Sequence, residues 1–539
     1  MKKFLSLALV LLLALGVLAG CGGGNDASGS QSFGDASNMP APTGDGEYKD
    51  TVILATGSDQ NYMDGQMNNT NDKVLRTVYS SLVKRDQNNE IVGDLAESWE
   101  ISDDNLTWTF YLRQDVKFHN GKQFTSADVK ASYDRLLAED SLVRYASTMR
   151  FITDVSVVDD YTITMTTENP SPVMLANLCH RANLILDADY IEEYGLDLGL
   201  TAESCNGTGP YRLVQWDKDE MMVFEAFDDY FEGKPPTQNF IIQIIPDTSS
   251  RAMALETGEV DIADGLAVED VLRLQDVEGI SVNFYKYQGL HGFQFNCAHE
   301  YLSDSRLRRA VSHAINRQAI IDALYAPIGE YCATAPVSEV VFGYTDLGVV
   351  PYDPELSKQL MEEAGYADGF EFSILVYPNY NQSLPSAEMI VQDLAAVGIT
   401  ATIEIVDNAG FNAMQGNRTY PGENFPWGMF IMGYGPSSLD ADEGLRRLWT
   451  TSPDGNNNNN YGWYSNEEVD TLLPQAQVEM DPAKRIEIYK RVMEIVYLED
   501  PAAVFTNQRR IIYCMSDKVE GFQVDMRNAI NYTTLACRA

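Results

Sequence analysis

Segments with the pattern of strands alternate with segments that have the pattern of helices along most of this chain. Apolar residues occupy every second position from Leu106 to Leu112, which is the period of a strand with one buried face. Thr125 and Asp128 have the spacing of a capping box at the start of a helix. The alternation predicts a mixed α/β fold. We expect a hairpin over 155–165, strands over 260–262 and 399–406, and helices over 252–256, 354–364, 386–397 and 482–497, with one more capped by Ser303 or Asp304.

The first twenty residues have the pattern of a secretory signal peptide. Lys2 and Lys3 precede an apolar run from Phe4 to Ala19, and small residues follow it. The run is shorter than the roughly 20 residues of a membrane-spanning helix. Cys21 falls at the cleavage point, as in a bacterial lipoprotein signal, so we expect residues 1–20 to be removed and Cys21 to be lipidated. The alternative is an ordinary secreted protein in which this cysteine is incidental.

Residues 21–46 are predicted to form a flexible tether. They are rich in Gly, Ser, Asn, Asp and Pro and nearly free of large apolar side chains, so they cannot bury enough surface to fold. Lipid anchor, tether and folded body together predict an exported protein at the outer face of the bacterial cytoplasmic membrane, or in the periplasm.

The charge of the chain excludes some partners. In 539 residues there are 38 Lys and Arg against 79 Asp and Glu, a formal net charge of −41. Nucleic-acid binding requires a basic surface, and docking on anionic lipid by charge requires the same. We therefore expect no nucleic-acid partner, and contact with the membrane only through the N-terminal lipid.

Six cysteines remain besides Cys21, and an even number in an exported chain permits disulfides. Cys179 with Cys205 and Cys514 with Cys537 are the nearest in sequence, but fifteen pairings are possible. Buried free thiols are an equal alternative for all six, which include Cys297 and Cys332.

Motifs for catalysis or metal binding are absent from the sequence. There is no G-x-S-x-G, H-E-x-x-H, P-loop or G-x-G-x-x-G. His291, Cys297 and His299 would share one strand face only if that strand were unbroken, and packing is the simpler interpretation of all three. We expect a protein that is not an enzyme and holds no metal.

Several short motifs, in one order along the chain, resemble those of the family 5 extracellular solute-binding proteins. This family contains the oligopeptide-, dipeptide- and nickel-binding components of bacterial ABC importers. The resemblance covers nearly all of residues 50–525. Its motifs lie at 95–104, 118–122, 207–211, 229–235, 255–261, 304–310, 352–355 and 363–366.

The resemblance implies an α/β fold arranged as a two-lobed, periplasmic-binding-protein-like clamp of type II. Lobe one would comprise 47–290 and 508–539, with an extra subdomain inserted at 84–200. Lobe two would comprise 291–507. The chain would cross between the lobes near 288–292 and 505–510.

The same resemblance implies a receptor that closes on its ligand and delivers it to an ABC permease in the membrane. Such a receptor is expected to be a monomer, to need no cofactor and to break no bond. Peptides are the leading ligand class. The alternatives are a non-peptide solute, such as a sugar or a metal chelate, or a surface sensor that uses the same clamp.

By analogy with the family, three segments would face the ligand: the loop after the first strand, the crossing strand and the region 427–442. In peptide-binding members an aspartate in that last region pairs with the ligand's α-amino group. The closest matching positions, 432–438, offer no acid here, although the two aspartates that follow could substitute or could cap a helix starting near Glu443. Arg418 could pair with a ligand carboxylate. The predicted ligand-binding residues are Asn61, Tyr62, Phe293, Gln294, Asn296, Trp427, Met432, Tyr434, Asp440 and Asp442.

Overall fold

The computed structural model describes residues 35–42, 44, 46–68, 73–143, 149–377, 382–407, 410–411, 426–451 and 460–539. The predicted signal peptide, Cys21 and Arg418 lie outside the described residues.

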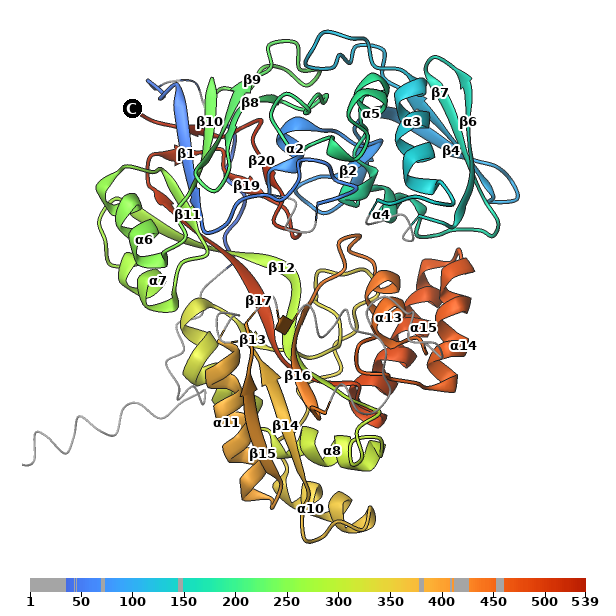
Figure 1. Ribbon diagram of the computed structural model, residues 1–539, viewed down its shortest axis with the longest axis vertical. Coiled ribbons are helices and arrows are strands. Elements are labelled where there is room, and N and C mark those ends of the chain that lie inside the picture. The colour runs from blue at the N-terminus through green and yellow to red at the C-terminus, as the bar shows by residue number, and fades with distance from the viewer. Residues whose placement is uncertain are drawn as a thin grey trace, which may run out of the picture. The chain divides into compact units, whose positions relative to one another are not determined.

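The largest sheet in the described residues has eleven strands (Figure 1). Its order is β15-β14-β16-β12-β17-β11-β1-β10-β9-β8, and β13 pairs with β17 beside this path. The first part of the path, β14, β15 and β16, is called here the C-terminal half-sheet, and β11, β1, β10, β9 and β8 are the N-terminal half-sheet. The strands are β1 Thr51–Thr56, β8 Tyr211–Asp217, β9 Met221–Ala226, β10 Asn239–Ile244, β11 Ile262–Asp264, β12 Ile280–Phe295, β13 Tyr331–Cys332, β14 Glu371–Val376, β15 Thr400–Ile405, β16 Met429–Tyr434 and β17 Ala503–Ser516.

Two long antiparallel strands, β12 and β17, join the half-sheets and contain both predicted crossings (Figure 1). Their pairing is irregular between Lys286 and Leu290 and again between His291 and Gly292. At the first irregularity the Gln508 side chain donates to the carbonyl oxygens of Tyr287 and Gly289, at 2.7 and 3.1 Å. These bonds satisfy carbonyl groups that the interrupted ladder leaves unpaired.

A separate four-stranded sheet has the order β4-β5-β7-β6, with β4 Ala96–Ile101, β5 Thr107–Leu112, β6 Ile152–Asp159 and β7 Thr162–Thr167. The predicted alternation is confirmed in β5, where Trp108, Phe110 and Leu112 are buried. The predicted hairpin is β6–β7. Helix α3, Ser126–Leu137, begins after Thr125, whose amide donates to Asp128 as the capping box requires. This sheet and α3 enclose a hydrophobic core of their own.

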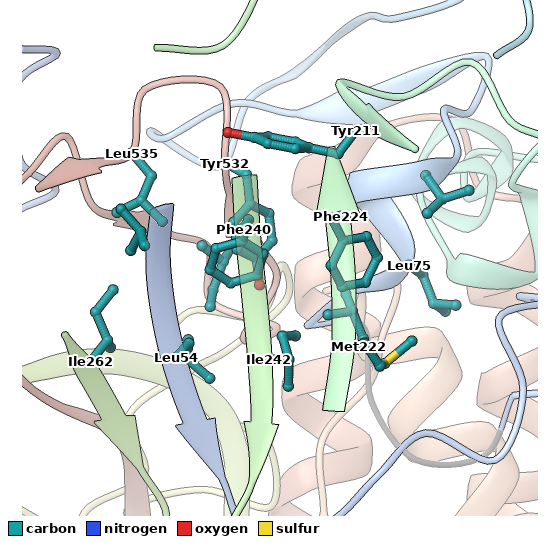
Figure 2. Close-up of a cluster of buried hydrophobic side chains, with 14 of the residues drawn as sticks. Leu54, Leu75, Tyr211, Met222, Phe224, Phe240, Ile242, Ile262, Tyr532 and Leu535 are labelled. Atoms are coloured by element: carbon teal, nitrogen blue, oxygen red, sulfur yellow. The ribbon is translucent and has the colours of Figure 1, made fainter. Parts of the chain in front are cut away.

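The core of the N-terminal half-sheet combines strand residues with the C-terminal segment (Figure 2). Tyr532 packs on Phe240 of β10 with ring centroids 4.4 Å apart, and Leu535 belongs to the same cluster. Because β10 and the chain's end are distant in sequence, this packing fixes the C-terminus to the half-sheet. A third core surrounds Trp449 and the helices near the C-terminal half-sheet.

Most predicted helices are confirmed with their caps. Asp304, Asp353 and Asp481 each accept a backbone N–H at a helix N-terminus, and Pro354 and Pro482 occupy the first position of their helices. The helices are α2 Leu75–Val78, α4 Met174–Leu178, α5 Ala188–Tyr194, α6 Thr248–Thr257, α7 Val268–Leu274, α8 Ser305–Ala314, α9 Arg317–Ile320, α10 Pro354–Glu363, α11 Ser383–Ala396, α13 Ala441–Trp449, α14 Glu467–Val478 and α15 Pro482–Glu494. Short 3₁₀ turns cover Arg181–Asn183, Gly195–Asp197 and Ala326–Ile328.

Two predicted elements differ from the structure. The strand expected over 260–262 is β11, Ile262–Asp264, because the Asp261 carboxylate accepts the Ile53 amide and pairs with Lys49 before the regular ladder begins. The helix expected to continue to Tyr497 changes at Ile495 to a π-helical turn, Ile495–Glu499, as also occurs over Ile321–Tyr325.

The last part of the predicted tether is not free of the folded body. The Ala36 amide donates to the Phe284 carbonyl and the Met39 amide to that of Phe522, and both side chains pack on the core of the N-terminal half-sheet.

The structure also contains short two-stranded sheets. They are β2 Val83–Arg85 with β3 Ile91–Gly93, β18 Val519–Glu520 with β21 Ala536–Cys537, and β19 Gln523–Val524 with β20 Ile530–Asn531.

All six cysteines in the described residues are free thiols, and four of them are buried. Of the two alternatives for these cysteines, the structure therefore has thiols and not disulfides. No helix in the described part of the chain has both the length and the apolar character needed to cross a membrane.

Candidate functional site

A cavity of about 550 Å³ lies beside the crossing strands, and residues of β11, β12, β17 and the segments around them contribute to its wall. We call it the crossing cavity. Asp264, at the carboxyl end of β11, lines it from the N-terminal side. In open sheets the carboxyl ends of parallel strands are the usual position of ligand sites, and β11 runs parallel to β1. Tyr287, Glu330, Gln382 and Arg509 line the rest of the wall.

Asp264 contributes a carboxylate group to the cavity wall. Its Oδ2 is paired with the buried ammonium of Lys73. Its Oδ1 is shielded from solvent and has no hydrogen-bond partner among the described residues. A buried acceptor without a donor is unfavourable, so a ligand N–H or ammonium group would be stabilised here.

Two adjacent arginines on β17 supply positive charge. The Arg509 guanidinium lies 5.4 Å from the ring centre of Tyr287, a cation–π contact. Arg510 donates through Nε to the Gly329 carbonyl at 3.2 Å, and its Nη1 pairs with Asp35. Both arginines therefore bring positive charge to the cavity wall while contacting neighbouring groups of the protein.

Glu330 is a buried acid at the same wall. It accepts a hydrogen bond from the Asn507 side chain and a longer one, 3.4 Å, from the Arg510 amide. Burial raises the pKa of Glu330 to about 7, although the positive charge of Arg509 acts in the opposite direction. This carboxyl group therefore changes its charge near neutral pH.

The predicted residues of the first segment, Asn61 and Tyr62, lie in the turn after β1. Both are half-buried, and the Tyr62 carbonyl accepts the Asn68 side chain at 2.5 Å. Neither residue lines the crossing cavity.

The predicted residues of β12 and its end have mainly structural surroundings. Phe293 is buried. The Asn296 side chain donates to the Trp427 carbonyl at 2.9 Å and accepts the Ala298 amide at 3.0 Å, so its amide group ties two segments together. Gln294 is buried, and its Nε2 has no hydrogen-bond partner among the described residues.

The aromatic residues predicted around β16 lie at its two ends. Tyr434 pairs with Leu290 near the crossing, while Met429, beside Trp427, pairs with Phe295. The two ends of a strand of this length are about 17 Å apart, so Trp427 and Tyr434 do not contact the same part of a ligand.

These side chains also differ in their surroundings. Trp427 donates through Nε1 to Glu404 at 2.6 Å. Met432 belongs to the core near the C-terminal half-sheet. Burial raises the pKa of Tyr434 well above its ordinary value, and its hydroxyl has no partner among the described residues.

Asp440 is the N-cap of α13, as the alternative interpretation held, and the helix begins at Ala441 instead of near Glu443. Its carboxylate accepts the Asp442 amide at 3.0 Å and pairs with the buried Arg485 guanidinium at 2.9 Å. Burial raises the pKa of Asp440, and Arg485 opposes that shift. These internal partners occupy the carboxylate, and a ligand contact by Asp440 stays a prediction.

Asp442 is only partly committed to internal contacts. One oxygen pairs with Arg446 at 3.1 Å, while the buried Oδ1 has no partner among the described residues. Of the two predicted aspartates, Asp442 is therefore the one that retains an available oxygen.

The interpretation of His291, Cys297 and His299 as a metal site depended on one unbroken strand. Strand β12 ends at Phe295, so Cys297 and His299 lie beyond it. The described residues contain no group of three or more His, Cys, Asp or Glu side chains that could hold a metal ion.

Sequence reasoning missed the residues that line the crossing cavity: Asp264, Tyr287, Glu330, Gln382 and Arg509. One signal was present. Two consecutive arginines, Arg509 and Arg510, fall within the expected crossing at 505–510, where a strand between two lobes has little reason to carry exposed charge. The others come together only through the pairing of distant strands.

Comparisons with known proteins agree with this architecture. Residues 90–456 match the family model described as bacterial extracellular solute-binding proteins, family 5 middle. A glutathione-binding protein GsiB from Salmonella typhi is 29% identical over 453 residues, covering 84% of this chain and 87% of that protein. The GsiB of Escherichia coli K12 is 28% identical over the same shares. Both relatives are named as binding proteins and not as enzymes.

Solved structures show the same fold. The periplasmic binding protein DppA from Helicobacter pylori, in complex with the peptide STSA, matches with a TM-score of 0.79 at 25% identity, covering 92% of this chain and 99% of that one. NikZ from Campylobacter jejuni, with Ni(L-His), matches with a TM-score of 0.79 at 23% identity, covering 91% and 100%. The fold is thus the mixed α/β, two-lobed, type II-like clamp of the periplasmic binding proteins.

Proposed function

The chain belongs to the bacterial extracellular solute-binding proteins of family 5, and we propose on this basis that it is the substrate-binding receptor of an ABC importer for short peptides. It acts outside the cytoplasmic membrane as a monomer, anchored by a lipid on Cys21. It delivers its ligand to a membrane permease and performs no chemistry on it.

The charge arrangement of the crossing cavity supports a peptide as the ligand. A short peptide has a cationic amino end and an anionic carboxyl end. The cavity wall places the carboxylate of Asp264 to meet the first and the guanidinium of Arg509 to meet the second. Both are charge-assisted contacts, which are shorter and stronger than hydrogen bonds between neutral groups. The peptide in DppA and the glutathione of the GsiB relatives, itself a tripeptide, belong to this chemical class.

Closure around the ligand would be carried by β12 and β17. Their pairing is irregular near residues 286–292, so a change of angle there costs fewer ladder hydrogen bonds than elsewhere. We place the boundary between the lobes near this point. Lobe one then contains 47–290 and 508–539, including an insert at 84–200. Lobe two contains 291–507. A ligand that contacts both lobes stabilises the closed form, which is the form that would engage the permease.

The remaining predicted residues have unequal parts in this proposal. Tyr434 and Asp442 keep buried oxygens without partners among the described residues, but neither lines the crossing cavity, so a ligand contact by either stays a prediction. Asn61 and Tyr62 would close the site from the first lobe. Asn296, Met432 and Asp440 are left to structural roles, because their side chains are engaged within the protein or packed in its core.

The test is calorimetric titration of the purified protein with dipeptides, tripeptides and glutathione. We expect binding of at least one of them, and weaker binding when its carboxylate is amidated. Arg509→Gln should weaken binding by at least about tenfold, the effect of one charged hydrogen bond. Arg491→Gln is the matched control, since Arg491 pairs with Glu468 and Glu499 on the exposed face of α15.

Two results would contradict the peptide assignment. One is a nickel–histidine complex or a sugar that binds while no peptide does, which would indicate the non-peptide alternative. The other is full peptide affinity in Arg509→Gln, which would move the carboxylate contact to another part of the protein.

A further inference from the structure

A second cavity, of about 300 Å³, lies between α2, the β2–β3 hairpin and the β19–β20 hairpin. We call it the hairpin cavity. It shares no lining residue with the crossing cavity, and it contains none of the residues predicted to bind the transported ligand. Its volume is at the lower end of the range for small-molecule sites.

Basic and acidic side chains both line the hairpin cavity, but the acids are already engaged. Asp94 and Glu232 pair with Lys84, at 3.4 and 2.6 Å. Asp525 pairs with Arg527 at 2.5 Å. The remaining acid, Asp86, accepts backbone N–H groups of its own turn at 2.8 Å. Each lining carboxylate therefore has a partner in the protein.

Arg85 lines the cavity without an acidic partner among the described residues. Its Nη1 donates to the Asn89 carbonyl at 2.8 Å and its Nη2 to the Ser438 carbonyl at 2.7 Å. Its Nε–H is shielded from solvent and has no acceptor among the described residues. Arg85 also forms no ion pair there, so a positive charge is held in a largely enclosed place with only neutral acceptors.

The surroundings of Arg85 make a positive charge without a counter-ion unfavourable. Burial lowers its pKa and the nearby guanidinium of Arg527 acts in the same direction, while Cys179, Asp440 and Asp525 act in the opposite direction. A guanidinium nevertheless stays protonated in proteins. An anion in the cavity would offset this positive charge through a charge-assisted contact.

From this arrangement we propose that the hairpin cavity is a second ligand site, which binds a small organic carboxylate through Arg85. The amide side chains of Gln523 and Asn531 and the ring of Tyr230 also line the cavity. They provide donors and an apolar surface for the body of such a molecule. The site is separate from the one that receives the transported peptide.

The test uses saturation-transfer NMR on the full-length protein with succinate and benzoate as probes, at constant ionic strength. We expect saturable binding of at least one probe to the wild type. Binding should weaken by at least about tenfold in Arg85→Gln, because one charged contact is lost. Lys130→Gln is the matched control, since Lys130 pairs with Asp134 on the exposed face of α3; it should bind as the wild type does.

A second variant leaves Arg85 and its contact to Ser438 intact. Ala529 is buried and lines the cavity, so Ala529→Leu should fill part of the space and also reduce binding. Arg509→Gln, in the crossing cavity, should leave probe binding unchanged.

Three results would overturn the proposal. These are no saturable binding to the wild type at millimolar concentration, equal binding in Arg85→Gln and Ala529→Leu, or displacement of the probe by sulfate at the same ionic strength. A loss of probe binding in Arg509→Gln would instead assign the carboxylate to the crossing cavity and would equally overturn a second site.

Discussion

At the scale of single residues, Glu330 shows how burial changes the chemistry of an ordinary side chain. Its pKa in the folded protein, about 7, lies above the value of 4.5 expected when it is exposed. Between these two values the folded state binds more protons than the unfolded state. The contribution of Glu330 to stability is therefore present at low pH and is lost as the pH rises toward 7.

We predict that Glu330→Gln removes this dependence. The unfolding free energy of the variant, relative to the wild type, should rise by about 3 kcal/mol between about pH 5 and about pH 8, since one pKa unit corresponds to about 1.4 kcal/mol. Urea denaturation at the two pH values measures the difference. A difference that stays constant with pH would show that Glu330 titrates normally in the folded state.

A second prediction at this scale concerns the contribution of Asp440 to the unfolding free energy. Its carboxylate and the Arg485 guanidinium are each only 5% exposed. Asp440→Asn leaves a buried cation without its counter-ion, so the unfolding free energy should fall by about 3 kcal/mol or more. The folded fraction should keep its affinity for peptide, because this carboxylate is already engaged within the protein.

The control for Asp440 is Asp229→Asn, which breaks an exposed pair with Lys117. We expect this change to cost no more than about 1 kcal/mol in urea denaturation. Equal effects of the two substitutions would contradict the buried pair, and a selective loss of peptide affinity in Asp440→Asn would restore the original expectation of a ligand contact.

At the scale of elements, the need for glycine at position 207 is purely steric. A Cβ at this position would lie 1.8 Å from the Val78 carbonyl oxygen. Its φ is not positive, so the requirement is the close approach of two backbones and not an unusual turn. The motif at 207–211 therefore marks a contact between α2 and the start of β8.

Gly207→Ala should consequently lower the unfolding free energy by at least about 2 kcal/mol, because the clash involves backbone that cannot rotate away. Gly46→Ala is the matched control, since the nearest atom to an added Cβ is 3.9 Å away; we expect a change within about 0.5 kcal/mol. If Gly207→Ala unfolds at the same urea concentration as the control, the close approach is not present in solution.

Elements whose pattern is local could be predicted from the sequence. The period of two in β5, the capping box of α3 and the Asp-Pro starts of α10 and α15 all depend on residues within one turn or strand. The order of strands in the sheet and the irregular pairing of β12 with β17 could not be read in this way. The pairing of β12 with β17 is set by contacts between segments more than two hundred residues apart.

The candidate site follows the same rule. The family resemblance pointed to strands and loops, but it could not show which partners their side chains have in the folded chain. Trp427, Asn296 and Asp440 are residue types that suit a ligand site, yet each is engaged by a partner that only the folded chain brings near. Conversely, Asp264, Glu330 and Arg509 meet around one cavity from three distant parts of the sequence.

At the scale of the whole molecule, the free thiols predict that a reducing agent does not change the stability. All six described cysteines are unpaired, and burial raises the pKa of Cys514 to about 12. The urea midpoint should therefore be the same with and without a reducing agent. A structural disulfide would instead contribute about 2–4 kcal/mol, which a reductant would remove.

As a whole, the molecule is proposed to be a receptor that encloses a short peptide. The most direct measurement is native mass spectrometry of the protein as purified from cells. We predict a mass excess equal to one short peptide, or to a series of them, that disappears when the protein is denatured. A single non-peptide mass, or a ligand-free protein that also fails to bind any peptide in titration, would contradict the account.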